Sequence, residues 1–135
     1  MSSGVVIGRA QVLDAVERYV PERRIEAEAV EAEVERLWTA IGAALDELTE
    51  LRNKTEEELG SDPAKILDFH IGVLQDPTLV APMQERITKG LVNAERAVAE
   101  RFDQLAKQFR GMESEVFRQK ANDIIDLDRR ILGKL

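Results

Sequence analysis

Features that would define a metal or thiol site are scarce in this sequence. It contains no cysteine and one histidine, and aromatic residues make up 4% of its 135 positions. Without cysteine there is no disulfide framework and no thiolate chemistry, a pattern that fits a cytoplasmic protein. A zinc site needs several Cys or His ligands, which one histidine cannot supply. We therefore expect no metal site built from these residues.

Long apolar runs and an excess of basic charge are also missing. No hydrophobic stretch approaches the roughly 20 residues that span a bilayer, and the N-terminus lacks a basic segment followed by an apolar run. We expect neither a membrane span nor a signal peptide. The formal net charge of −7 argues against a nucleic-acid groove and against an anionic membrane surface. A basic protein partner is compatible with it.

The composition that is present favours one helical domain. Charged residues are 33% and hydrophobic residues 44% of the chain, and helix formers such as Ala, Leu, Glu and Arg abound. Residues 4–13 are the exception, because aliphatic and β-branched residues there predict a strand. Either this strand packs on the helices or its sheet belongs to sequence outside this chain. We divide the chain into 1–20, strand and connector, and 21–135, the helical domain.

A long helix is predicted from about Glu26 to Leu59. Its apolar positions step by four and three residues alternately, which places them on one stripe. The stripe consists of Val30, Val34, Leu37, Ile41, Ala44, Leu48, Leu51 and Thr55. Gly60 suits the terminal turn. Such a stripe is typical of antiparallel packing in a bundle, and less often of a coiled-coil seam.

The stretch from Ser61 to Leu79 contains one helix-start signal twice, Ser-Asp-Pro and then Asp-Pro. A small polar residue caps free N–H groups, and proline at the first helical position loses no hydrogen bond. The residue before proline disfavours helical geometry. We therefore predict two helices in series, 62–75 and 77–89, that meet at a corner at Gln75–Asp76. This corner is either a docking surface beside His70 or a plain connection between core helices.

Two more helices complete the predicted fold. Asn93 can cap a helix that continues to Gly111, and another runs from about Ser114 to Gly133. The connections are short, so neighbouring helices should be antiparallel. The predicted fold class is all-α, an antiparallel helical bundle with one interrupted helix, plus the N-terminal strand of an adjoining α/β domain.

The residues support no catalytic arrangement. A Glu-x-x-His di-metal site is excluded in its usual form because position 67 is leucine. There is no phosphate-binding loop and no Ser-His-Asp candidate, and carboxylates on helices more often form a solvated face. His70 is a core residue, a surface contact or a phosphate carrier, and its neighbours Phe69 and Ile71 offer no phosphate donors. We expect a binding domain with no catalytic residue.

Four stretches resemble one protein family. They are SSGVVIGRAQVL at 2–13, EAEVERL at 31–37, ILDFHIGVLQDPTL at 66–79 and FRQKANDIIDLDRRIL at 117–132. Together they resemble the N-terminal part of Enzyme I of the bacterial phosphoenolpyruvate:sugar phosphotransferase system. The third stretch is the most specific, and the four are spread over nearly the whole chain.

The resemblance implies a function that spacing does not. Enzyme I passes phosphate from phosphoenolpyruvate through a histidine to the small phosphocarrier protein HPr, with Mg²⁺ as its metal ion. Its helical subdomain, inserted after the first strand of an α/β domain, is the HPr-docking platform. The phosphorylated histidine is expected beyond residue 135, so His70 is not that residue and this fragment alone should be inactive. The fragment should be a monomer, because the family's dimer contacts lie in a distant C-terminal domain.

Carried over position by position, the docking surface surrounds the helix break and includes the last two helices. Its residues are Asp62, His70, Gly72, Val73, Leu79, Phe109 and Lys120. Leu79→Ala is expected to weaken partner binding more than folding. Family members often carry acidic residues around 61–64 and 77–78, where this sequence has few. Two alternatives stay open, namely a nitrogen-branch paralogue of Enzyme I and a self-standing helical interaction domain.

Overall fold

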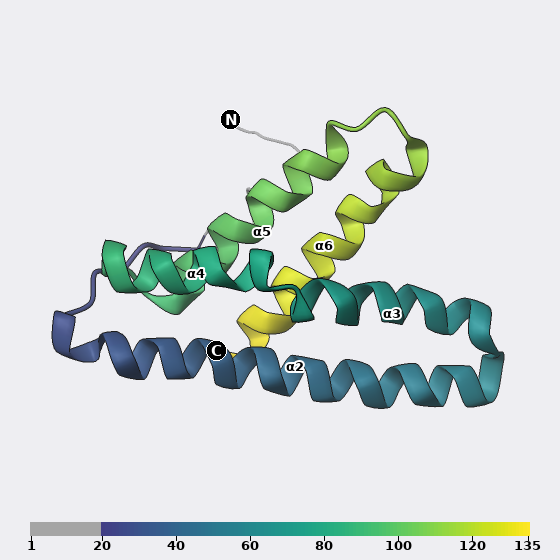
Figure 1. Cartoon of the computed structure of the whole chain (residues 1–135), viewed down its shortest axis with the longest axis horizontal. Coiled ribbons are helices and arrows are strands. Elements are labelled where there is room, and N and C mark those ends of the chain that lie inside the picture. Colours follow the sequence, from purple (N-terminus) through teal and green to yellow (C-terminus); the bar gives the residue numbers. More distant parts are fainter. Residues whose placement is uncertain (1–19) are drawn as a thin grey trace, which may run out of the picture.

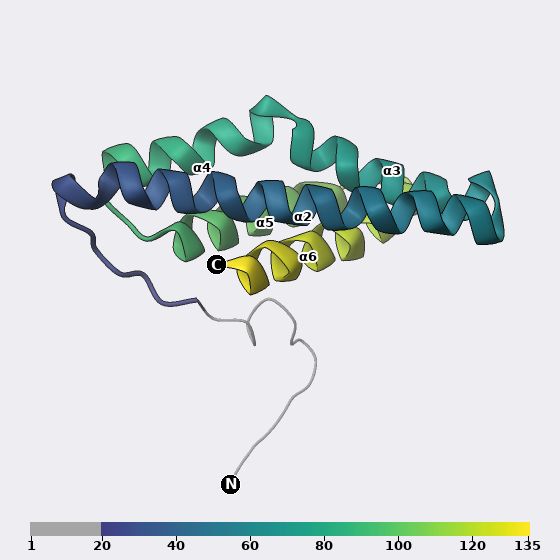
Figure 2. The ribbon, with the colours of Figure 1, turned by 90° about the horizontal axis from the view of Figure 1, so that it is seen from below.

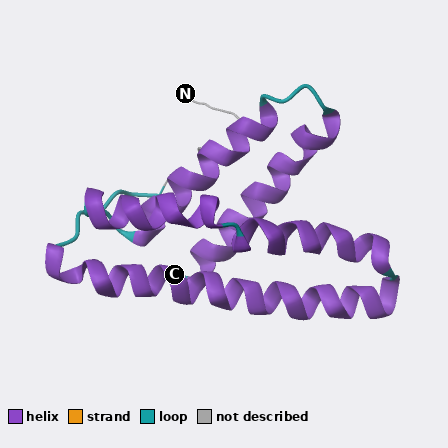
Figure 3. Ribbon diagram, viewed as in Figure 1, coloured by secondary structure: helices purple, strands orange, loops and turns teal. Residues whose placement is uncertain are grey.

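The computed structural model describes residues 20–135, which form helices with no strand among them (Figures 1 and 3). After a 3₁₀ turn at Ala27–Ala29, the helices are α2 (Val30–Leu59), α3 (Ser61–Gln75), α4 (Pro77–Gly90), α5 (Ala94–Arg110) and α6 (Glu115–Lys134). The helical prediction is confirmed for these residues, and the strand predicted at 4–13 lies outside them. None of the described helices is both long and apolar enough to cross a membrane.

The long helix α2 buries the middle of the predicted stripe. Leu37, Ile41, Ala44 and Leu48 are at most 2% exposed, because α3 and α4 pack along α2 in the opposite direction (Figure 1). Leu51 is 41% exposed, since α3 alone accompanies the C-terminal end of α2 (Figure 2). The helix begins later than predicted, because the chain first makes the 3₁₀ turn.

The corner between α3 and α4 forms as predicted. The Asp76 carboxylate accepts hydrogen bonds from the Thr78 N–H at 2.9 Å and from its hydroxyl at 2.8 Å, and Pro77 begins α4. The side-chain cap predicted from the Ser-Asp-Pro signal is wrong, because α3 already begins at Ser61 and its N-cap is Gly60, with a φ of 97°. Glycine adopts this conformation without the steric cost of a Cβ. Backbone freedom therefore takes the place of a side-chain cap between α2 and α3.

The start of α5 also differs from its predicted cap. The Asn93 side chain holds the connector, since its oxygen accepts from the Arg23 N–H at 2.8 Å. The first N–H of α5, at Ala94, donates instead to the Glu33 carboxylate of α2 at 2.7 Å. A carboxylate from a distant helix thus supplies the cap that no local pattern could indicate.

A cluster of charges around Arg36 joins the start of α2 to the start of α5. The Arg36 guanidinium donates to Glu95 at 3.1 Å, to Glu33 at 3.0 Å and to the carbonyl oxygen of Leu135 at 2.9 Å. The hydrogen bond from Arg36 is the main cause that lowers the pKa of Glu95 to about 2. Because Glu33 also binds the first N–H of α5, the cluster fixes how α5 packs on α2.

The helices α5 and α6 form an antiparallel hairpin that crosses α2, α3 and α4 obliquely (Figure 1). In the view from below, α3–α4 and α6 lie on opposite sides of α2 (Figure 2). Side chains from all of these helices fill one core, whose fully buried members include Leu37, Ile41, Leu48, Leu74, Met83, Ile87, Phe102, Ile124, Leu127 and Ile131. The arrangement agrees with the predicted antiparallel bundle, and the oblique hairpin brings α5 over the corner between α3 and α4.

Candidate docking cleft

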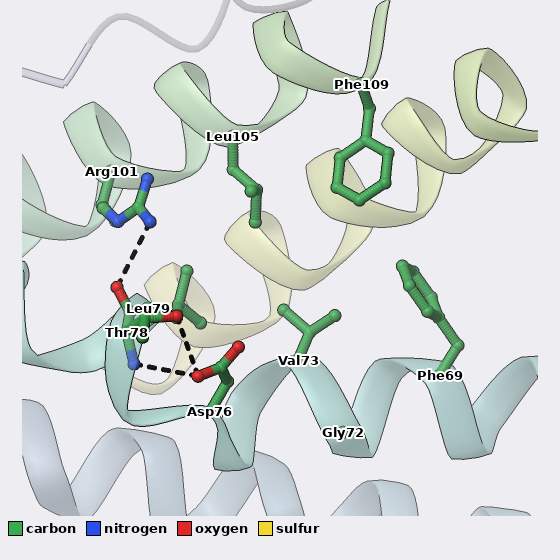
Figure 4. A pocket seen from close by; sticks show the side chains of 9 residues that line it. All are labelled: Phe69, Gly72, Val73, Asp76, Thr78, Leu79, Arg101, Leu105 and Phe109. Carbon is green, nitrogen blue, oxygen red and sulfur yellow. Dashed lines mark hydrogen bonds between the residues drawn. The ribbon is translucent and has the colours of Figure 1, made fainter. Parts of the chain in front are cut away.

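A cleft of about 350 Å³ opens at the corner between α3 and α4 and faces α5 (Figure 4). Its lining comes from α3, the helix break, the first turn of α4 and α5, and is mostly apolar. The lining residues are Phe69, Gly72, Val73, Asp76, Thr78, Leu79, Arg101, Leu105 and Phe109. Because the Asp76–Pro77 break turns the chain, the end of one helix and the start of the next contribute to the same cleft.

One face of α3 supplies a wall and the rim of the cleft. Asp62, Ile66, Phe69, Val73 and Asp76 follow one another at intervals of four and three residues, so they share a face. Ile66 is 57% exposed, whereas Phe69 and Val73 are half-buried. The face therefore runs from an acidic end, through apolar side chains, to the acidic cap of α4.

Three phenylalanines, the aromatic cluster of Phe69, Phe109 and Phe117, connect α3 to the hairpin. Phe69 lies edge-on to Phe109 with ring centroids 6.3 Å apart, and Phe109 lies 6.0 Å from Phe117 of α6. The Lys120 ammonium sits 4.1 Å from the centroid of the Phe69 ring. A cation–π contact of this kind adds about 0.5–1 kcal/mol at an exposed site. The cluster thus holds α3 against α5 and α6 beside the cleft.

The other end of the cleft is polar, and most of its hydrogen bonds are made within the chain. Pro82 lies inside α4 and has no N–H to donate to the carbonyl of Thr78, one helical turn earlier. Arg101 of α5 donates to that carbonyl at 3.3 Å. The pKa of Asp76 is lowered, chiefly by the hydrogen bond from the Thr78 N–H. One donor is left over, because Arg101 Nε is buried without an acceptor among the described residues.

Apolar surface continues beyond the cleft around the turn between α5 and α6. Met112, Val116 and Phe117 are 40%, 60% and 44% exposed. Phe117 adjoins the lining residue Phe109, and Ile66 shares the face of α3 that carries Phe69 and Val73. We call Ile66, Met112, Val116 and Phe117 the apolar margin of the cleft. Exposed groups of this kind mark interaction surfaces. Elsewhere within residues 20–135 the large exposed hydrophobic residues all lie on α2, and they are Trp38, Leu51 and Leu59.

Most of the residues predicted for docking come together here. The cleft lining includes Gly72, Val73, Leu79 and Phe109. Lys120 adjoins the cleft through its contact with a lining ring. Asp62 lies on the same face of α3, with its side chain 92% exposed and its carboxylate 3.6 Å from the Lys65 ammonium. The geometry therefore places these residues on one continuous surface, with Asp62 at its rim.

Leu79 is a core residue as well as a lining residue. It is 3% exposed and belongs to the central hydrophobic cluster. This burial argues against the expectation that Leu79→Ala weakens partner binding more than folding, because removal of a buried leucine side chain costs about 2–5 kcal/mol. Val73 is half-buried in the cleft and is the better position for separating binding from folding.

His70 lies on another flank of α3. It is 8% exposed, and its Nε2 lies 3.5 Å from Asp123 Oδ1 on α6. It borders a separate cavity of about 450 Å³, whose other residues are Glu47, Leu67, Asp126, Arg129, Arg130, Gly133 and Lys134. Its burial fits the interpretation of His70 as a core residue that packs α3 against α6.

The docking set predicted from sequence omits Phe69, Arg101, Leu105 and Phe117. A local signal exists for three of them. Arg101 and Leu105 precede Phe109 at intervals of four residues on α5, and Phe69 precedes Val73 by four residues on α3. The place of Phe117 depends on how the hairpin packs on α3, which sequence spacing cannot supply.

Comparison with known proteins places this fold and cleft in a family. The family model described as PEP-utilising enzyme, N-terminal, matches residues 1–120, so the chain belongs to that family. Its relatives include the phosphoenolpyruvate-protein phosphotransferases of Listeria innocua and Priestia megaterium, both 37% identical over 134 residues. That of Bacillus subtilis is 35% identical over 134 residues. Each comparison covers 99% of this chain and 23% of the relative, so the chain spans about a quarter of their length.

Two solved structures share the fold. A solution structure of Enzyme I (nEIt) matches with a TM-score of 0.79 at 26% identity, over 86% of this chain and 47% of that one. The N-terminal domain of Enzyme 1 - Nitrogen matches with a TM-score of 0.81 at 22% identity, over 93% of this chain and 51% of that one. The second likeness concerns the fold alone. The resemblance to the N-terminal part of Enzyme I is confirmed.

Proposed function

We propose that this chain is the N-terminal part of a phosphoenolpyruvate-protein phosphotransferase and that its cleft docks the phosphocarrier HPr. The observation that carries the proposal is the apolar cleft at the α3–α4 corner, together with its exposed apolar margin. A concave apolar surface with aromatic residues near its centre and charges at its rim is typical of a protein interface. Membership of the family supports this use of the surface.

The surface suits a partner that dissociates after each transfer. Phe69 and Phe109 supply aromatic contact area at the centre, and Asp62 and Lys120 supply opposite charges toward the edges. A carrier must leave after each cycle, so the expected affinity is near the micromolar range, on the order of −8 kcal/mol.

Phosphoryl chemistry belongs to the rest of the transferase in this proposal. His70 is buried beside Asp123 and packs edge-on against Phe69, a poor setting for a doubly charged phosphoryl group. We assign Mg²⁺ to the rest of the transferase as well, as the resemblance to Enzyme I implies. The chain's own residues bind and orient HPr, in the cytoplasm.

Titration of the isotope-labelled chain with HPr from the same genome tests the docking. Resonances of Val73, Leu79, Phe109 and Lys120 should shift together, because these residues line or adjoin the cleft. Those of Trp38, which is exposed on α2, should stay in place. Shifts confined to another face would assign the docking site to that face. The absence of any shift at millimolar HPr would contradict docking.

A second arm examines phosphate transfer. Incubation of the chain with phosphoenolpyruvate and Mg²⁺ should leave its mass unchanged. Acid-labile phosphate on His70 would overturn the assignment of phosphoryl chemistry to the rest of the transferase.

A parallel titration uses the HPr-like carrier of the nitrogen branch. Tighter binding of that carrier would assign the paralogue, and binding of neither carrier would favour a self-standing interaction domain.

A further inference from the structure

Gly72 lies in the middle of α3 and in the wall of the cleft. Its backbone does not demand glycine, because Gly60 is the glycine with positive φ among the described residues. Packing does not demand it either, since a Cβ at Gly72 would meet no heavy atom within 4 Å. Glycine is disfavoured in helix interiors relative to every residue except proline. What the missing side chain provides is open space in the wall of the cleft.

Apolar groups border this space. On the surface of α3, Phe69 precedes Gly72 by one helical turn and Asp76 follows it by one turn. Leu105 and Phe109 point toward α3 from α5 (Figure 4). The carboxylate of Asp76 is already engaged as the cap of α4. A group that enters the space beside Gly72 therefore meets mainly hydrocarbon.

We propose that Gly72 forms a socket for one large apolar side chain of the docking partner and is thereby a specificity-determining residue of the cleft. This inference rests on the proposed function, and its occupant is a Leu, Met or Phe side chain presented by HPr. A charged side chain would lose hydration there without gaining a partner, and a small one would leave the walls uncontacted. The cleft volume of about 350 Å³ admits a side chain of that size.

Filling the socket from within the chain tests the inference. The variants are Gly72→Ala and Gly72→Leu, and the matched control is Gly42→Ala in α2. At Gly42 a Cβ would also meet nothing within 4 Å, and this residue does not line the cleft. Alanine should raise the melting temperature by a few degrees at both positions, because it favours the helix. The affinity for HPr should fall about threefold in Gly72→Ala and about tenfold or more in Gly72→Leu, and stay unchanged in Gly42→Ala.

A double-mutant cycle identifies the occupant. Each exposed Leu, Met and Phe of HPr is truncated to Ala in turn, and its affinity is measured by calorimetry against the wild-type chain and against Gly72→Leu. Truncation of the HPr side chain that fills the socket should lower the affinity for the wild-type chain. It should lower the affinity for Gly72→Leu much less, because the socket is already filled in that variant. Equal effects for every HPr side chain in both backgrounds would contradict the socket.

The outcomes separate the socket from docking itself. Unchanged or tighter HPr binding by a folded Gly72→Leu variant overturns the socket and leaves docking in place. A wild-type chain that binds no HPr overturns the proposed function and the socket together. If Gly72→Leu does not fold, the test rests on Gly72→Ala. An HPr affinity of Gly72→Ala equal to that of Gly42→Ala would contradict the socket.

Discussion

Arg101 of α5 donates a hydrogen bond to the carbonyl oxygen of Thr78 at 3.3 Å and supplies the donor that the backbone of α4 lacks. The residue whose N–H would ordinarily bind this carbonyl is Pro82. A side chain from another helix thus compensates for a proline inside α4. The same bond ties the helix break to α5 at the polar end of the cleft (Figure 4).

Arg101→Met should lower the free energy of unfolding by about 1 kcal/mol, because the Thr78 carbonyl loses its donor while much of the apolar stem is kept. Pro82→Ala restores a backbone N–H, so Arg101→Met should cost little in that background. Urea denaturation of the wild type, both single variants and the double variant measures this coupling. Equal losses in both backgrounds would mean that Arg101 stabilises the fold by another route.

Leu79→Ala should lower the free energy of unfolding by about 2–4 kcal/mol, because its side chain is 3% exposed within the core. Val73→Ala, at a half-buried position in the cleft, should cost about 1 kcal/mol and lower the affinity for HPr. Thermal denaturation and calorimetry on the same samples separate the two effects. A wild-type melting temperature for Leu79→Ala would contradict its place in the core.

Acid should weaken the fold partly through Glu95. Arg36 holds the pKa of Glu95 at about 2, below the ordinary value of 4.5. A folded-state pKa below the unfolded one means that the ion pair stabilises the fold above that ordinary value, and that this contribution is lost as the pH falls toward the folded-state pKa. Because the Glu95 side chain is 28% exposed, solvent screening reduces the contribution to roughly 1 kcal/mol.

Glu95→Gln should therefore lower the stability at neutral pH and flatten its dependence on pH between about 5 and 2. Urea denaturation at a series of pH values measures both changes. The control is Glu57→Gln, at an exposed position of α2, which should keep the acid-induced loss of the wild type. A Glu95→Gln variant with the same acid-induced loss as the wild type would show that other carboxylates account for it.

Phe117→Ser should lower the affinity for HPr about tenfold, because it removes aromatic area from the apolar margin of the cleft. Its cost in stability should be small, about 1 kcal/mol, since the side chain is already 44% exposed. The control is Leu59→Ser, which removes a 70% exposed apolar side chain at the far end of α2. Calorimetry should show wild-type affinity for this control, and equal losses in both variants would argue against a docking surface at the margin.

The helices, the corner between α3 and α4, and the family could all be predicted from the sequence. Apolar periodicity and the Asp76–Pro77 signal act within a few residues of the chain, so they can be read locally. The break offered one candidate place for a docking surface, because the residues on both of its sides had to lie near one another, with a plain connection between core helices as the alternative. The four motif stretches indicated the family without any knowledge of packing.

The caps, the aromatic cluster and the place of His70 depend on how the helices pack, and could not be predicted from the sequence. Glu33 caps Ala94 although 61 positions separate them, so no local window contains both. Phe69, Phe109 and Phe117 meet because the α5–α6 hairpin crosses α3. An α-helix places residues two apart on nearly opposite sides, and the packing of α6 decides which side is buried. Gly72 therefore lines the cleft, while His70 faces Asp123 in the interior.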